Sequence, residues 1–479
     1  MAIAIISVLS VLMAFATERY YLSLLPVAIL LVAATLYNIR FTYFLLLFTI
    51  PLSVEYSFSA SLGTDLPDEP LMICLMFATL FYLLHKPHEL PKGFVLHPIF
   101  LLLVIYLFWI LVTAFTSVSH IVSFKYFLAK LWYVVTFTVL SAIILKEPKA
   151  IRYIFWSVFI PLTLLIIQVI IRHAMIGFSF DEINKPMAPF FRNHVAYAAI
   201  VTIMIPFIWL ARNWYSARWV RILLMLSVLL YVVAVYFSYT RTCYLALFFI
   251  PVFVWIMKKK LMKQALLAAT LLIIAVLAYL MYDSRYMQYA PEYEQTVIHD
   301  DFGEHITSTF EGKDVSSMER VYRWIAILHM WKDRPFFGFG PGNFYPHYKG
   351  YTVLSFETYV SENEERSTAH NYFLLLLAEQ GVPGVIIFTV FTLVIFVWCE
   401  RIYHRARLAE DKNLVMAVSL VLMISYVNLM LSDMLESDKV GPFYFLSLAV
   451  LIVTDLRTRA TTNGSSTDVT RVSTVAPSI

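Results

Sequence analysis

Residues 97–114 read HPIFLLLVIYLFWILVTA, and this run contains no Asp, Glu, Lys or Arg. A helix needs about 20 mostly apolar residues to cross the roughly 30 Å hydrocarbon core of a bilayer, so this run approaches the length of a membrane span. The whole chain has the same character, because 60% of its 479 residues are hydrophobic and 14% are charged, against about 25% charged in soluble domains. A water-soluble globular protein is therefore excluded.

Apolar runs of this kind recur along the chain and predict an all-α polytopic integral membrane protein. They lie near residues 2–17, 20–36, 41–53, 70–84, 97–114, 126–145, 152–171, 194–211, 218–237, 242–257, 264–282, 383–400, 413–431 and 440–455. The first three are short or closely linked, so we expect about 12–14 transmembrane helices. The formal net charge of +4 is too small to indicate nucleic-acid binding, and the three cysteines indicate packed thiols with neither disulfides nor metal spacing.

The basic residues predict which loops face the cytoplasm, because short cytoplasmic loops retain Lys and Arg. Alternate connections and the C-terminal tail hold twenty of the 36 basic residues: Arg40, Lys86, Lys92, Lys146, Lys149, Arg152, Arg212, Arg218, Arg221, Lys258, Lys259, Lys260, Lys263, Arg401, Arg405, Arg407, Lys412, Arg457, Arg459 and Arg471. We therefore expect both termini to be cytoplasmic.

Four regions follow from this pattern. We expect an N-terminal transmembrane bundle at 1–282, a large outward loop at 283–370, C-terminal transmembrane helices at 371–456 and a disordered cytoplasmic tail at 457–479. The loop holds fourteen acidic and eight basic residues and is too long for a mere connector.

Several basic side chains are expected at the outward ends of the spans. Arg192 and His194 precede the run near 194, and Arg241 follows Ser-Tyr-Thr between two spans. Such residues are costly in a membrane and are candidates for function, although anchoring at the bilayer surface explains any one of them equally well.

Residues 315–331 of the large loop predict an amphipathic helix on the membrane surface. Ser316 and Glu319 have capping-box spacing, and Arg320 and Arg323 flank an apolar stripe. These arginines either point into a cavity above the bilayer or bind lipid headgroups. The following run, PFFGFGPGN at 335–343, is rich in turn-forming residues and is expected to end the helix and to let another group approach its backbone closely. It is not a nucleotide P-loop, because no Lys-Ser or Lys-Thr follows it.

The stretch 367–384, STAHNYFLLLLAEQGVPG, predicts a helix of about a dozen residues. Ser367 or Thr368 is expected to cap it, and Gly381 with Pro383 to end it. At 1.5 Å per residue such a helix is roughly 18 Å long, so it would dip into the bilayer and hold His370 near the outer surface. A neutral imidazole there suits general-base chemistry on a hydroxyl, whereas an isolated histidine at a helix start is otherwise a cap or a packed side chain.

These residues together resemble the O-antigen ligase and O-antigen polymerase superfamily of bacterial envelope glycosyltransferases. The resemblance covers about 185–440. It is carried by the junction ending in Arg241, by Arg320 with the Gly-rich run after it, and by His370-Asn371 followed by Glu379, Gly381 and Gly384.

The resemblance implies a GT-C-like enzyme of the bacterial inner membrane with its site on the periplasmic face and no metal or other cofactor. Such an enzyme moves a glycan from an undecaprenyl-diphosphate donor to a hydroxyl, with inversion. In ligases the acceptor is a sugar of the lipid A core; polymerases and protein O-oligosaccharyltransferases use other acceptors. His370 would be the base, and Arg241 and Arg320 would hold the diphosphate, with Arg192 as a third arginine and Arg323 as a substitute for Arg320. Asn371, Glu379 and His194 would support the site.

Two other readings stay open. The acidic loop Asp65-Leu66-Pro67-Asp68-Glu69, with Glu55 nearby, could hold Mg²⁺ or Mn²⁺ for a metal-dependent lipid-linked glycosyltransferase. A polysaccharide flippase or transporter would also have about 14 spans, but it would leave the long loop and His370 unexplained.

Overall fold

A computed structural model describes residues 2–17, 23, 25–59, 62–147, 149–283, 315–353 and 369–472. Within these ranges the chain is helical apart from one two-stranded hairpin, so the predicted all-α polytopic class is confirmed.

The described residues form α-helices and six shorter helical segments labelled η, of which η2 (Ile50–Leu52), η3 (Pro87–Glu89) and η10 (Met434–Glu436) lie in connections between the elements named next. They are α1 (Ala2–Ala16), α2 (Leu25–Tyr37), α3 (Ile39–Thr49), α4 (Asp68–His85), α5 (Pro98–Phe115), α6 (His120–Val134), η4 (Val135–Leu140), α7 (Ser141–Ile144), α8 (Ala150–Met175), α9 (His194–Ala211), η5 (Arg212–Trp214), α10 (Arg218–Tyr236), α11 (Arg241–Lys259), α12 (Met262–Met281), α14 (Val315–Asp333), α15 (Phe344–His347), η8 (Tyr348–Tyr351), α16 (Tyr372–Arg405), α17 (Ala409–Leu429) and α18 (Gly441–Val472).

Each of the fourteen predicted runs coincides with a helix or with part of one. Among the described residues, ten helices are long and apolar enough to cross a membrane, and three apolar helices are shorter: Leu25–Tyr37, Ile39–Leu52 and Met262–Val276. Two of these short helices lie in the N-terminal region, where the sequence left the number of spans open.

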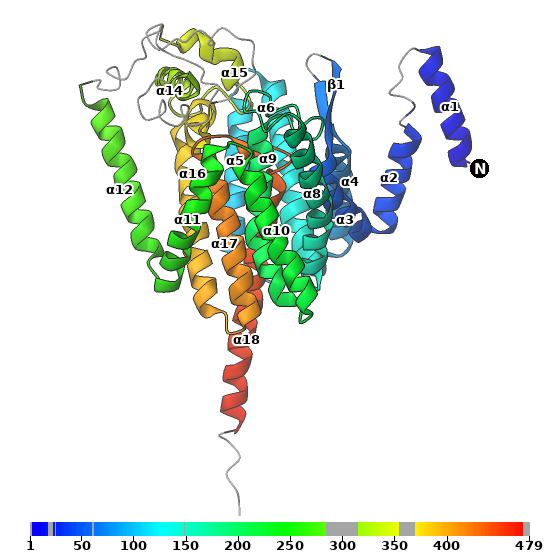
Figure 1. The fold of residues 1–479 in the computed structure, drawn as a ribbon, viewed down its shortest axis with the longest axis vertical. Coiled ribbons are helices and arrows are strands. Elements are labelled where there is room, and N and C mark those ends of the chain that lie inside the picture. Colours follow the sequence, from blue (N-terminus) through cyan, green and yellow to red (C-terminus); the bar gives the residue numbers. More distant parts are fainter. Residues whose placement is uncertain are drawn as a thin grey trace, which may run out of the picture.

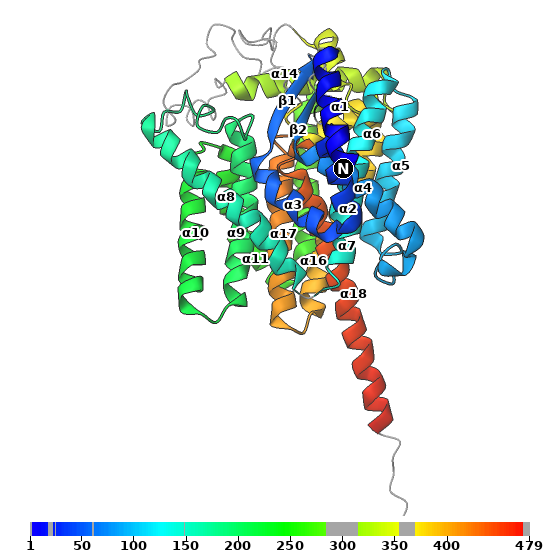
Figure 2. The same ribbon diagram turned by 90° about the vertical axis from the view of Figure 1, so that its right-hand side faces the viewer.

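The spans form a bundle whose centre is α9 and α17 (Figure 1). Most of the apolar stretch of each of these helices is buried inside the protein, and α17 packs against α9, α11, α16 and α18. Figure 2 shows α14 lying across one end of the bundle, while the turn from α9 to α10 lies at the other. We call these the α14 end and the basic end, because Arg212, Arg218 and Arg221 lie in or beside that turn.

A β-hairpin, β1 (Val54–Ser59) paired antiparallel with β2 (Leu62–Leu66), was not predicted. Val54, Tyr56 and Phe58 alternate with polar residues, which is the period of a strand, but the segment is short beside the long apolar runs.

The buried face of α14 differs from the predicted stripe. Glu319 and Arg323 are only 7% and 8% exposed, and they share this face with Tyr322, Ala326 and Met330. Arg323 therefore lies on the packed side of the helix and not on its flank. The ion pair between Arg323 Nη2 and Glu319 Oε2, at 3.3 Å, makes this burial possible because each side chain compensates the charge of the other.

The predicted end of the short helix at Gly381 is confirmed: α16, although it runs from Tyr372 to Arg405, consists of two helices that meet at a break, and the second contains the run predicted at 383–400. Gly381 breaks the helix with φ 67° and ψ −171°, and a membrane span resumes beyond Pro383. Proline is tolerated there because the first residues of a new helical segment have no amide partner to lose.

The Gly-rich run 335–343 fits into this break, and we call the contact the interlock. The amides of Phe339 and Gly340 donate to the carbonyls of Ala378 and Glu379 at 2.9 and 2.8 Å, and the amide of Val382 donates to the carbonyl of Pro335 at 3.0 Å. The carbonyl groups freed by the break are thus satisfied by a separate segment.

The turn between α5 and α6 closes the other side of the same run. The amide of Val118 donates to the carbonyl of Phe339 at 3.1 Å, and Asn343 Nδ2 donates to Ser117 Oγ at 3.0 Å. Trp109 of α5 donates from Nε1 to the carbonyl of Gln380 at 3.0 Å. The run is therefore held between two spans.

At the basic end, α18 runs to Val472 and so enters the range 457–479 expected as a tail (Figure 1). Asp455 of α18 accepts from His97 Nε2 of α5 at 3.0 Å and pairs with Arg405 of α16. The N-cap of α5, the last turn of α16 and the middle of α18 are joined there.

We predict that Gly381→Ala destabilises the protein more than Gly177→Ala. A Cβ at Gly381 would lie 2.2 Å from the carbonyl oxygen of Phe336, whereas nothing lies within 4 Å of a Cβ at Gly177. Both glycines have nearly the same positive φ, of 67° and 66°, which disfavours an L side chain in both variants, and ψ of −171° puts Gly381 in a region that essentially only glycine adopts. Overpacking adds about 1–3 kcal/mol at Gly381 alone. Thermal unfolding in detergent measures the difference, and equal melting temperatures would disprove the interlock.

Candidate active site

His370 lies in a tight turn at the start of α16, at the α14 end. Its φ is 51°, a positive value that is uncommon outside glycine and is adopted mainly by asparagine, aspartate and histidine. The turn is fixed on both sides, because Trp324 Nε1 of α14 donates to the carbonyl of Ala369 at 2.9 Å and Asn371 Nδ2 donates to the carbonyl of Met430 at 3.0 Å. The turn that carries His370 is thus held by α14 and by the end of α17.

The cap of α16 is Asn371. Its Oδ1 accepts from the amide of Leu374 at 3.0 Å, as an N-cap side chain does. Ser367 and Thr368, which we expected to cap the helix, lie outside the described residues.

Arg320 and Arg323 of α14 are close enough to His370 to act on its charge. Burial, and then the charges of Arg320 and Arg323, lower the pKa of His370 from 6.5 to about 3. The imidazole is therefore neutral at physiological pH. The structure brings together three of the predicted site residues, the histidine and both arginines of α14.

Arg241 is the first residue of α11 and is partly buried. Two residues later, Cys243 Sγ lies 3.8 Å from Asn428 Oδ1 of α17, and Asn371 reaches Met430 just beyond the end of α17. The starts of α11 and α16 therefore both meet the end of α17, which puts Arg241 at the α14 end of the molecule.

Arg192 and His194 have contacts of a different kind. Arg192 is exposed, and its Nε lies 3.9 Å from Glu55 Oε2 of the hairpin. The backbone amide of His194 donates to Asn184 Oδ1 at 2.9 Å. These contacts tie the loop before α9 together and do not link either residue to His370.

Glu379 belongs to the interlock. Its side chain is buried, and its Oε1 accepts from the amide of Phe344 at 3.0 Å, while the backbone of Gly342 also donates to it. The residue that we expected to support the site thus satisfies two backbone amides at the end of the Gly-rich run.

A buried polar cluster behind His370 was not predicted as a unit. Lys130 Nζ and the hydroxyl of Tyr126 each donate to Glu436 Oε1 at 2.7 Å. Tyr372, two residues after His370, lies 2.8 Å from Tyr106 through the two hydroxyls. The sequence showed Lys130 inside an apolar run but gave no sign of its partner, which is 306 residues away.

The acidic loop considered as a metal site lies beside one basic residue, Lys439, and one further carboxyl group, Asp438, which is hydrogen-bonded to Asp65. Asp68 is buried near Lys439, whose Nζ donates to the carbonyls of Ile50 and Ser53 at 2.7 and 2.8 Å. In the part of the chain that the structure describes, no group of three or more His, Cys, Asp or Glu side chains could hold a metal ion.

Comparison with protein families identifies the region that contains this turn. Residues 226–389, about a third of the chain, match the family model described as O-antigen ligase. The chain carries an O-antigen ligase domain. The predicted superfamily is confirmed, and at the level of the family the domain indicates a glycosyltransferase of the O-antigen ligase or polymerase type.

Some of the predicted site residues lie inside the O-antigen ligase domain and others lie outside it. Arg241, Arg320, Arg323 and His370 all lie inside it, whereas Arg192 and His194 lie before it. A search of curated proteins gave no match.

We predict that Glu379→Ala destabilises the protein by about 1–3 kcal/mol, because it leaves buried backbone amides without an acceptor. Glu379→Gln keeps an acceptor oxygen and should unfold close to the wild-type temperature in detergent. It should also keep its donor affinity and turnover. Loss of turnover in a normally folded Glu379→Gln protein would show that the carboxyl group takes part in the reaction.

Proposed function

We propose that the chain transfers a glycan from an undecaprenyl-diphosphate donor to an acceptor hydroxyl, with His370 as the base. The observation that carries this proposal is the convergence of His370 with Arg320 and Arg323 at the α14 end, inside the O-antigen ligase domain. The twenty basic residues of the predicted cytoplasmic loops favour a periplasmic location for that end, in a bacterial inner membrane.

Glycosyl transfer from a lipid diphosphate leaves negative charge on the departing phosphate. Arg320 would supply one guanidinium group and Arg241 a second from the start of α11, while Arg323 is buried and paired with Glu319. Arginine forks bind phosphate oxygens bidentately and remain charged at all relevant pH values. These residues would therefore neutralise the leaving group without requiring a metal ion.

The acceptor hydroxyl needs one positioned base. Deprotonation by His370 and attack at the anomeric carbon, with the C–O bond to the diphosphate breaking on the opposite side, inverts the configuration. The proton moves to the imidazole, and the bond electrons leave with the carrier diphosphate.

Donor binding would also strengthen the base. The charges of Arg320 and Arg323 contribute to the low pKa of His370. A diphosphate between these groups offsets that positive charge and so raises the pKa of the imidazole. His370 would then be an effective base only when the donor is bound. Without the donor, it would not deprotonate the acceptor hydroxyl.

A sugar of the lipid A core is the acceptor that we favour, and polymerisation of glycan repeat units is the alternative. Deleting the gene from its host and examining the envelope glycans distinguishes them. Free lipid A core beside carrier-linked polymer indicates a ligase, and core capped by one repeat unit indicates a polymerase. Normal glycans would contradict both.

We predict that His370→Ala and His370→Asn abolish transfer while the donor still binds. Asparagine tolerates the left-handed turn, so it separates loss of the base from disturbance of the backbone. His120→Ala, at an exposed histidine that starts α6, is the matched control and should remain active. Transfer by purified protein and donor binding are measured separately. Activity in both His370 variants would remove this residue from the mechanism.

We predict that Arg241→Ala and Arg320→Ala weaken donor binding by about tenfold or more, since each lost charge-assisted contact contributes about 1.5–3 kcal/mol. Lysine at either position should restore binding only in part, because the bidentate fork is lost. Donor titration of the purified variants measures this. Normal affinity in both alanine variants would contradict the diphosphate role.

We predict that Arg323→Gln moves the acid limb of the pH profile of kcat/KM to higher pH. Removing a positive charge beside His370 favours the protonated imidazole and so raises its pKa from about 3. Arg334→Gln, which removes an exposed arginine just after α14, should leave the limb in place. The measured quantity is the pH at which kcat/KM falls on the acid side of the profile, determined for each variant with saturating acceptor. A shift in Arg323→Gln alone indicates that His370 is the titrating group, and no shift contradicts it.

A further inference from the structure

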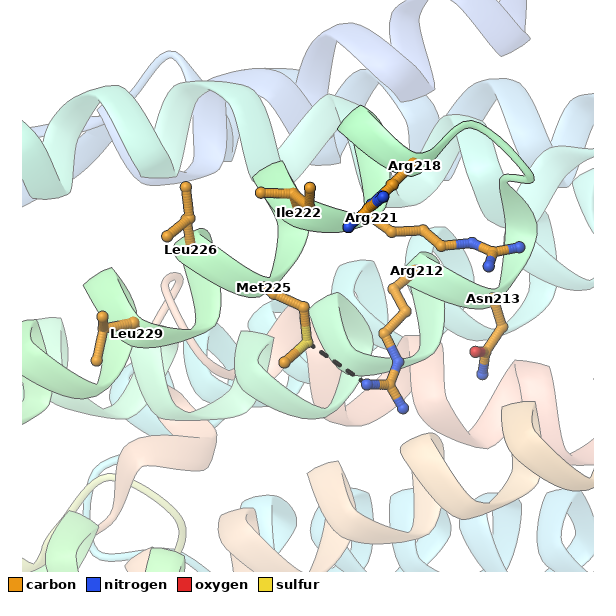
Figure 3. Close-up of a pocket in the computed structure, with 8 residues that line it drawn as sticks. All are labelled: Arg212, Asn213, Arg218, Arg221, Ile222, Met225, Leu226 and Leu229. Atoms are coloured by element: carbon orange, nitrogen blue, oxygen red, sulfur yellow. Dashed lines mark hydrogen bonds between the residues drawn. The ribbon is translucent and has the colours of Figure 1, made fainter.

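A cavity of about 600 Å³ lies at the basic end, where α9 turns into α10 (Figure 3). It is formed by η5, which follows α9, and by the first turns of α10. His194 begins α9 at one end of the helix and Arg212 follows it at the other, so the cavity is about a membrane thickness away from the His370 turn.

The lining of the cavity has a charged part and an apolar part. Arg212, Arg218 and Arg221 gather at one side, as Figure 3 shows. Ile222, Leu226 and Leu229 continue from them along one face of α10 at the spacing i, i+4 and i+7. None of the lining residues, all of which the structure describes, is acidic.

Two of the arginines are held in place by neighbours. The Cζ of Arg212 lies 3.6 Å from the ring centre of Trp209, and its Nη1 lies 3.4 Å from Met225 Sδ. Arg221 donates from Nε to the carbonyl of Tyr215 at 2.6 Å. A guanidinium group that is already oriented loses less side-chain entropy when it binds an anion.

The surroundings place this cavity at a bilayer surface. Trp209 and Trp219 flank it with 49% and 71% of their surfaces exposed, and tryptophan is enriched where a membrane meets water. Ile222, Leu226 and Leu229 are 49%, 59% and 61% exposed, and such side chains on a membrane span are stable against acyl chains.

We propose that this cavity binds an anionic phospholipid of the leaflet at the basic end. The phosphodiester lies among Arg212, Arg218 and Arg221, and one acyl chain follows Ile222, Leu226 and Leu229. Three guanidinium groups without a carboxylate attract a net negative headgroup over a zwitterionic one. A free phosphate would leave the apolar wall uncovered, whereas a lipid covers both parts of the lining at once.

The test is a lipid titration of the full-length protein, purified in detergent and observed by native mass spectrometry. Phosphatidylglycerol should bind at least tenfold more tightly than phosphatidylcholine with the same acyl chains. The triple variant Arg212→Gln, Arg218→Gln and Arg221→Gln should lose this preference. The matched control is Lys258→Gln, Lys259→Gln and Lys260→Gln, which removes the same charge at the end of α11 and should keep it.

A second variant, Leu226→Trp, keeps the arginines and fills the apolar groove, so it should weaken phosphatidylglycerol binding about tenfold. Glycerol phosphate, a headgroup without chains, should bind far more weakly than the lipid. Equal binding of the two lipids, an unaffected triple-glutamine variant, or glycerol phosphate binding as tight as the lipid would overturn the proposal. None of these readouts involves glycan transfer, so the result is independent of the proposed reaction.

Discussion

The hydrogen bonds between the Gly-rich run 335–343 and the break in α16 join the two elements that carry His370, Arg320 and Arg323. A helix that is interrupted inside a membrane protein has amides and carbonyls that no lipid can satisfy. Here Phe339, Gly340 and Val382 take part in bonds that satisfy them, and the same run is held by the turn between α5 and α6. Because α14 leads directly into this run, its position over the bundle is determined by the break, and so is the approach of Arg320 and Arg323 to His370.

Sequence composition was enough to predict the fold class and the helices. Fourteen apolar runs became helices because the penalty for exposing polar backbone or charge in a bilayer exceeds every local preference. The sequence could not predict which helices pack together. Periodicity describes one segment at a time, whereas the contacts that fix the bundle, such as Lys130 with Glu436 or His97 with Asp455, join residues more than 300 positions apart.

For the site, sequence predicted the residue types better than their surroundings. His370, Arg320 and Arg323 do lie close together, but the stripe on α14 predicted Arg323 on a flank, since periodicity counts an arginine as polar wherever it stands. Its pairing with Glu319 one turn earlier allows it to be buried. By contrast, Gly381 and Pro383 carry the usual signals of a helix end and correctly predicted the break in α16, but the sequence could not show that the backbone of Phe336 packs against Gly381.

The break in α16 also determines how deep the reaction would occur. At 1.5 Å per residue, the segment from Pro383 to Arg405 extends about 34 Å, which is enough by itself to cross the hydrocarbon core. The segment from Tyr372 to Gln380 adds up to about 14 Å beyond the break. These lengths would put His370 at the level of the lipid headgroups, where, under the proposed function, a carrier embedded in the membrane would present its diphosphate and keep the attached sugars in water.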